Sequence, residues 1–205
     1  MSTTKASTKV KKYKLCRRLG AGVFEKCQTQ KFLLVQGQGK KQNMRRTDYG
    51  NQMIEKQKVK FSYGVREKQF GNYVNRAMEH GGKQVSPATM LFQILESRLD
   101  NAVYRLGFAN TRALARQMVS HGHILVNGKK TTVASMQLKK SDVISIREGS
   151  KSSVLFKDIA TKLKGYKTPE WLNWNATALT GTVGGSPVNP DPFLQFQSVI
   201  EFYSR

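Results

Sequence analysis

Apolar residues recur at spacings of three and four along one stretch in the middle of the chain. They are Leu91, Leu95, Leu99, Ala102, Val103 and Leu106. This spacing places them on one side of a helix, while a polar set falls off the stripe: Glu96, Arg98, Asp100 and Arg105. The pattern predicts a single amphipathic helix with a polar face, ended by Gly107.

A shorter helix and a small sheet are predicted to follow. Asn110 or Thr111 can cap a helix that runs to about Ser120, with apolar positions at Leu114, Ala115, Met118 and Val119. Beyond Gly122, β-prone residues flank the dipeptide Asn127-Gly128, which favours a two-residue hairpin turn. Residues 143–146 indicate a further strand. Residues 91–150 therefore predict a module of two packed helices and a small sheet.

Two more helices are predicted upstream of this module. Thr47 or Asp48 can cap a helix starting near Tyr49, and Gly64 interrupts the pattern. A second helix is expected from about Arg66 to Glu79, ended by Gly81-Gly82, with helically spaced apolar positions at Phe70, Tyr73, Val74, Ala77 and Met78. We interpret these aromatic residues as core rather than base-stacking groups. The opposite faces are expected to be basic, at Lys56, Lys58, Lys60, Arg66, Lys68 and Arg76.

The net charge of the chain indicates that the protein binds a polyanion. The 205 residues include 35 Lys and Arg against 13 Asp and Glu, a net charge of +22. Residues 1–90 contain 20 Lys and Arg and 5 Asp and Glu, so most of the excess lies there. Repulsion among so many cations is most simply relieved by a polyanionic partner. Residues 36–46 combine glycine, amide and cationic residues, and we expect a loop that a partner orders.

The remaining composition narrows the class of protein. The longest aliphatic run, residues 32–35, is far shorter than the ~20 residues of a membrane span, so no membrane partner is expected. Residues 1–14 have no apolar stretch and predict a basic arm rather than a secretory signal; an organellar transit peptide is the alternative. Two cysteines, Cys16 and Cys27, fit a reducing compartment and no disulfide framework.

Two arginines and a hairpin suggest a surface for phosphate. Arg112 and Arg116 are four residues apart and are expected on one exposed helix face, and a guanidinium suits phosphate oxygens. Gln117 and Ser120 lie nearby, Lys129 and Lys130 extend the basic ridge along the hairpin, and a folded RNA would fit it. A generic solvated basic face is the competing interpretation. His121 and His123 lack a third metal ligand, so a surface or RNA-contacting role is preferred.

These segments resemble the bacterial small-subunit ribosomal protein S-four family. The likeness is carried by residues 95–108 and 111–129, by Asp48-Tyr49-Gly50 with residues 55–58 and 63–70, and by residues 169–172 and 199–205. It covers most of the chain from about Tyr13 and keeps family order. The resemblance implies an α+β fold, with a mainly helical subdomain and a two-helix and small-sheet RNA-binding module. We divide the chain into a basic arm and loop (1–46), the helical subdomain (47–90 and 151–205, irregular over 181–198) and the module (91–150).

The resemblance also implies a function and a set of contacts. It implies a structural, non-enzymatic component of the cytoplasmic small ribosomal subunit, which binds the five-prime domain of its RNA early in assembly. Its expected site is near the messenger RNA entry channel, beside the S-five and S-three family proteins, where it contributes to translational accuracy. The RNA-contacting residues predicted are Arg17, Arg18, Lys40, Lys41, Arg45, Arg46, Tyr49, Lys56, Lys58, Arg66, Lys68, Gln69, Arg98, Arg112, Arg116, Gln117, Ser120, His121, His123, Asn127, Lys129 and Lys130.

One departure from the family concerns metal. Many members carry four N-terminal cysteines that bind zinc, whereas here Tyr13 takes the first position before Cys16, Arg17 and Arg18. Two cysteines cannot supply four ligands, so no zinc and no other cofactor is predicted.

Two alternative functions remain. An RNA-modifying enzyme is the weaker one, because residues 151–205 are too short for a catalytic domain. A free-standing regulator of messenger RNA is compatible with the ribosomal role.

Overall fold

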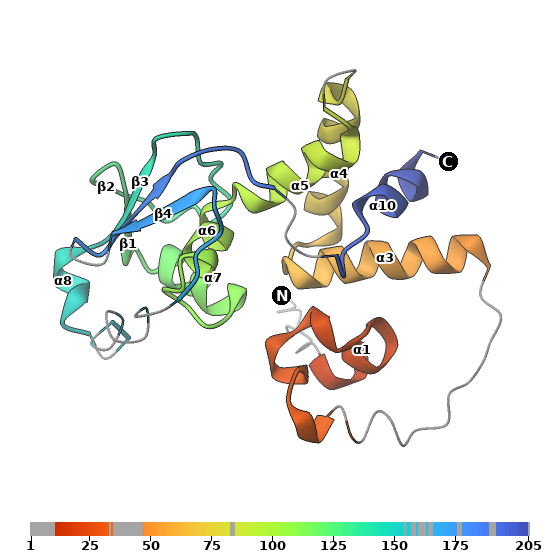
Figure 1. Ribbon diagram of the computed structural model, residues 1–205, viewed down its shortest axis with the longest axis horizontal. Helices are drawn as coiled ribbons and strands as arrows, with labels where there is room; N and C mark the ends of the chain where they lie inside the picture. The colour runs from red at the N-terminus through yellow and green to blue at the C-terminus, as the bar shows by residue number, and fades with distance from the viewer. Residues whose placement is uncertain are drawn as a thin grey trace, which may run out of the picture.

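The computed structural model describes residues 11–32, 34, 47–82, 85–153, 155, 156, 159, 163, 166–175, 178–188 and 192–204. Two units lie side by side, a helical subdomain and a mixed module (Figure 1). An N-terminal helix, α1 (Lys12–Leu19), and two 3-10 helices, η1 (Ala21–Val23) and η2 (Glu25–Cys27), pack beneath the helical subdomain. The loop expected at residues 36–46, with Lys40, Lys41, Arg45 and Arg46, lies outside the described residues.

Four helices form the helical subdomain. They are α3 (Asp48–Ser62), α4 (Glu67–His80), α5 (Pro87–Glu96) and the C-terminal α10 (Phe196–Tyr203). The Thr47 hydroxyl accepts from the Gly50 amide and caps α3, and Gly64 turns the chain at a positive φ of 62°. Phe70, Tyr73, Val74 and Ala77 are buried in this core, which confirms the core interpretation of the aromatic residues.

The module contains two short helices and a five-stranded sheet. Helix α6 (Leu99–Arg105) and helix α7 (Arg112–Ser120), which Thr111 caps, pack on the sheet. The strands are β1 (Ile124–Val126), β2 (Lys129–Lys130), β3 (Val143–Ile146), β4 (Leu172–Asn175) and β5 (Thr180–Val183), all antiparallel in the order β2-β1-β3-β5-β4. A short helix α8 (Glu148–Lys151) follows β3. The fold is α+β, as predicted.

The hairpin is formed as the sequence indicates. Asn127 and Gly128 have φ values of 50° and 77° between β1 and β2, the backbone sign that a two-residue turn of this kind requires. The Asn127 carboxamide also accepts from the Val143 amide at 2.8 Å and donates to Asp142 at 2.9 Å. These bonds fix the turn against the start of β3.

Two sequence expectations about the fold are wrong. The stripe from Leu91 to Leu106 is two helices: the chain leaves the helix at Ser97, because Leu138 donates its amide to the Ser97 carbonyl and Leu99 donates to Met136. Leu91 and Leu95 consequently belong to the core of the helical subdomain, and Leu99 to that of the module. Residues 172–183, expected in the helical subdomain, add β4 and β5 to the module's sheet.

Candidate nucleic-acid interface

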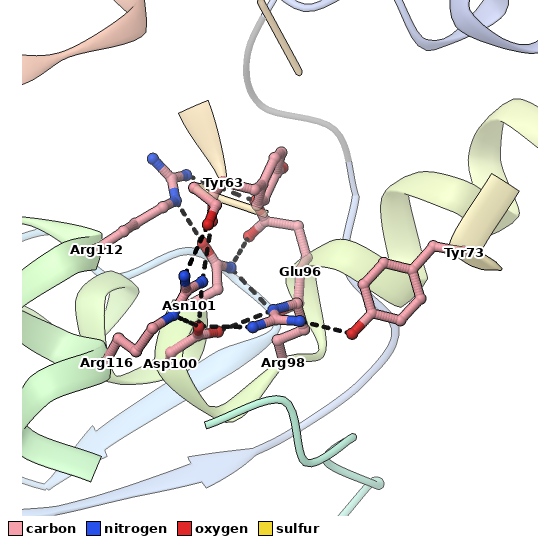
Figure 2. Close-up of polar contacts among 9 residues, drawn as sticks. Tyr63, Tyr73, Glu96, Arg98, Asp100, Asn101, Arg112 and Arg116 are labelled. Atoms are coloured by element: carbon pink, nitrogen blue, oxygen red, sulfur yellow. Dashed lines mark hydrogen bonds and ion pairs between the residues drawn. The ribbon is translucent and has the colours of Figure 1, made fainter. Parts of the chain in front are cut away.

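The polar residues around the α5–α6 break form a buried network between the two units (Figure 2). Arg98 donates through Nε and Nη2 to the two carboxylate oxygens of Asp100, at 3.0 and 2.7 Å. Its Nη1 donates to the Tyr73 hydroxyl on α4. Arg98 is only 4% exposed, so the expectation of a polar outer helix face is wrong at this residue.

Arg116 reaches from α7 to the same carboxylate. Its Nε and Nη2 donate to Asp100 Oδ2 at 2.9 and 2.7 Å, and Nη1 donates to the Gly64 carbonyl at 2.7 Å. Its side chain remains 38% exposed. Most of its donors are therefore used inside the protein, where they join the helical subdomain to α7.

The other members of the network lie around a second carboxylate, that of Glu96. Glu96 is fully buried and accepts from Arg105, from Asn101 Nδ2 at 2.9 Å, and from the Tyr63 hydroxyl at 2.6 Å. Arg112 donates through Nε to Asn101 Oδ1 at 2.8 Å. The guanidinium of Arg112 also lies over two rings, Tyr63 at 4.8 Å and Tyr104 at 4.5 Å. The sequence predicts an exposed helix face for Arg112 and Arg116, but most of that face lies inside the protein.

The network favours the charged forms of Glu96 and Arg98 and the neutral form of Tyr63. Burial opposes ionisation of Glu96, but the hydrogen bond and charge of Arg105 outweigh it and lower the pKa of this carboxyl. Burial, followed by the negative charge of Glu96, raises the pKa of Tyr63 well above its ordinary value. Burial disfavours the Arg98 cation, yet the hydrogen bond and charge of Asp100 raise its pKa. Buried, fully paired ions such as these fix geometry more than they add stability.

Exposed polar side chains, two of them lysines, lie at the end of α7 and along the hairpin. We call the set Gln117, Ser120, His121, Lys129 and Lys130 the hairpin surface; all five residues are exposed. The Lys130 side chain lies against Gly122, where its methylene carbons occupy the space that a Cβ would need. The hairpin and the end of α7 are thereby brought together.

The hairpin surface belongs to a stretch of sequence that contains no acidic residue. Residues 101–141 contain seven Lys and Arg and no Asp or Glu. The carboxylates at either end, Asp100 and Asp142, are bonded within the protein. The same stretch includes Lys139 and Lys140, which are exposed just before β3 and were not among the predicted RNA-contacting residues. The long interval without Asp or Glu was the sequence signal that could have identified them.

Two predicted contacts of the module serve the scaffold. His123 is half-buried, its Nδ1 lies 2.9 Å from the Ser150 hydroxyl, and its ring packs edge-on against Phe156. Asn127 is exposed, but both ends of its carboxamide bond to Asp142 and Val143. Both side chains are held in place by bonds within the protein.

The predicted contacts of the helical subdomain also separate into internal and external groups. Lys56, on α3, is 8% exposed, pairs with Glu67 at 2.5 Å and lies 4.7 Å from the Phe202 ring centre. Its expected place on a basic outer face is therefore wrong. Lys58 pairs with Glu55 at 2.6 Å and is 18% exposed. The exposed members are Tyr49, Arg66, Lys68 and Gln69.

The N-terminal helix presents two arginines. Arg17 and Arg18 are exposed in the last turn of α1, and neither has a hydrogen bond or ion pair with the rest of the described chain. Beneath them, Cys16 and Cys27 are joined by a disulfide and are fully buried. The expectation that the cysteines stay reduced is not met by this structure, because the turn at Gly20 brings η2 back against α1.

Within the described part of the chain, no three His, Cys, Asp or Glu side chains gather closely enough to share a metal ion. None of the helices described is both long and apolar enough to cross a membrane.

Comparisons with known proteins agree with both units. Residues 97–144 match the S4 domain model, and residues 7–96 match the Ribosomal protein S4/S9 N-terminal domain model. The chain is 43% identical over 200 residues to "Small ribosomal subunit protein uS4" of Roseiflexus sp. (strain RS-1), covering 94% of this chain and 96% of that protein. It is 44% identical to the protein of that name from Chloroflexus aurantiacus, with the same coverage, and 42% identical to that of Kosmotoga olearia.

Proposed function

The chain belongs to the uS4 family of small ribosomal subunit proteins, and from this premise we propose that it binds small-subunit ribosomal RNA chiefly through its exposed cations. The observation that carries the proposal is the hairpin surface, which sits in a stretch of 41 residues with seven Lys and Arg and no acid. Cations in a stretch of chain that has no acidic residue attract the phosphates of RNA.

The buried network supports this role by fixing distances. Arg98, Arg116 and Glu96 connect α4, α7 and the end of α3, so the hairpin surface is held at a set position relative to α3 and α4. Folded RNA is recognised by shape and phosphate position. A protein with two cationic surfaces at a fixed separation can therefore select one arrangement of RNA helices over another.

The family likeness supports a more specific role in the small subunit. We propose that the protein joins the five-prime domain of the small-subunit RNA early in assembly and contributes to accuracy near the messenger RNA entry channel. The S-five and S-three family proteins are its proposed neighbours. The work is structural rather than enzymatic, and a cytoplasmic location follows from the bacterial relatives.

Binding of a small-subunit RNA fragment at several salt concentrations tests the proposal. Lys129→Ala with Lys130→Ala should weaken binding and reduce the slope of log affinity against log salt by about 0.7–0.9 for each phosphate that is no longer neutralised. A matched control replaces two exposed cations outside the predicted set, Arg76 and Lys167, and should change neither quantity. Affinity that does not depend on salt, or equal losses in both variants, would reject the proposal.

A further inference from the structure

A polar pocket lies where the N-terminal helix meets the helical subdomain. Its volume is about 510 Å³, within the range of small-molecule sites. It is bounded by α1, by one face of α3 and by the start of α10. We call it the arm pocket. Its lining includes Arg17, Arg18, Gln52, Glu55 and Lys58.

The rim of the arm pocket favours an anion. Arg17 and Arg18 are exposed there and have no partner in the described parts of the chain. Lys58 also reaches the pocket but is paired with Glu55 at 2.6 Å. Two unpaired guanidinium groups at the mouth of a pocket suit the oxygens of a phosphate.

The inner wall of the arm pocket favours a hydrogen-bond donor instead. Gln52 and Glu55 are three residues apart on α3 and therefore share a face. Gln52 donates through Nε2 to Glu201, and Glu55 accepts from Lys58 through Oε1. Each keeps one further oxygen, Gln52 Oε1 and Glu55 Oε2, that is covered and accepts no hydrogen bond. A buried acceptor without a donor is unfavourable, so a donor from an occupant would satisfy either oxygen once its side chain has rotated into the pocket.

An occupant with a phosphate at one end and two adjacent donors at the other is a guanine nucleotide. The Watson–Crick edge of guanine carries N1–H beside the N2 amino group. Adenine and cytosine place an acceptor next to their amino group, and uracil flanks its single N3–H with two carbonyls. An ionised carboxylate only accepts hydrogen bonds, so it matches guanine and opposes the others. Unstacked bases of RNA are commonly read on this edge.

We propose that the arm pocket receives one unpaired guanine nucleotide of RNA, with its base edge on Glu55 and Gln52 and its phosphate on Arg17 and Arg18. The inference rests on the proposed RNA-binding function and adds a base preference to it. Since both oxygens are covered in the free protein, seating the base requires a side-chain rotation, a common event at interfaces.

Short RNAs test this with the full-length oxidised protein. The probes are fluorescent heptamers of uridine whose central residue is guanosine, adenosine, inosine or uridine, measured by anisotropy. Guanosine should bind about tenfold tighter than adenosine or uridine, the order expected for one bidentate base contact. Inosine lacks the N2 amino group and should fall between them.

Variants locate the preference in the arm pocket. Glu55→Gln should bring the guanosine and adenosine affinities together, with circular dichroism verifying the fold. Arg17→Ala with Arg18→Ala should weaken all four RNAs and leave their ranking unchanged. Asn51→Ala, a second pocket residue to which no essential contact is assigned, serves as the matched control and should keep the full preference.

The two failures are distinguishable. Salt-dependent binding of the ribosomal RNA fragment without any preference for guanosine overturns the pocket assignment and leaves the proposed function intact. A preference for guanosine that Glu55→Gln retains also overturns it. Failure to bind the ribosomal fragment at all rejects both.

Discussion

Arg98 and Asp100 form a two-point ion pair that is buried at the junction of the two units. The guanidinium donates to both carboxylate oxygens at 3.0 and 2.7 Å, and the two residues are 4% and 3% exposed. Asp100 Oδ2 additionally accepts from Arg116. One carboxylate therefore balances two guanidinium groups, and the helical subdomain and the module meet at it.

Removal of this carboxylate should be costly. Asp100→Asn leaves Arg98 buried without a counter-charge, and we expect the free energy of unfolding to fall by about 3–5 kcal/mol. Urea unfolding measures this. Glu148→Gln is the matched control, because Glu148 is 84% exposed and pairs only with Lys151; an exposed pair contributes about 0–1 kcal/mol. Similar effects of the two substitutions would show that the junction does not depend on Asp100.

Substitutions of Arg116 test whether this residue contributes to stability or to RNA binding. Its substitution by Ala removes two bonds to Asp100 and one to the Gly64 carbonyl, so we expect a loss of roughly 1–3 kcal/mol. Arg116→Lys should not restore it, because an ammonium cannot reproduce the fork of donors. Urea unfolding alongside RNA titration makes the comparison. Unchanged stability with weakened RNA binding would return Arg116 to the phosphate-binding role that its spacing from Arg112 suggests.

Local signals predicted most of the elements. Thr47 and Thr111 cap the helices expected after them, and Asn127-Gly128 makes the expected turn. These features depend on a few neighbouring residues, whose preferred backbone angles and side-chain hydrogen bonds decide the outcome. Their prediction needs no knowledge of the rest of the chain.

The features that local signals did not predict depend on contacts between residues far apart in the sequence. The break at Ser97 depends on backbone bonds to Leu138, and the strands at 172–183 depend on pairing with β3. The same limit applies to the candidate site. Helical spacing correctly sets Arg98 off the apolar stripe, but it cannot reveal that Tyr73 and Asp100 lie there as its buried partners. The exposure of Lys129 and Lys130 was predictable because they follow directly on a two-residue turn and form a short edge strand.

Acid should weaken the junction through Glu96. The pKa of this carboxyl is lowered from 4.5 in the folded protein, so its contribution is fully present above the unfolded value. That contribution is lost as the pH falls below about 4.5 and passes through the lowered folded pKa. Urea midpoints measured from pH 6 downward should therefore drop more steeply in the parent protein than in Glu96→Gln, which has no proton to take up at this position. Parallel acid limbs would contradict the assignment.

Reduction of the disulfide should loosen the N-terminal helix and leave the rest of the fold in place. Cys16 and Cys27 are 11 residues apart, and closing a loop of this order contributes roughly 3 kcal/mol in chain-entropy terms. Few other apolar residues hold this segment: Leu19 and Val23 are its other buried side chains among those described. Hydrogen exchange should therefore accelerate across residues 12–27 on addition of a thiol-free reductant, while α4 and β3 keep their protection. The double variant Cys16→Ser with Cys27→Ser should exchange rapidly with or without reductant. Equal protection in the oxidised and reduced protein would mean that packing on α3, not the cross-link, holds Arg17 and Arg18 at the arm pocket.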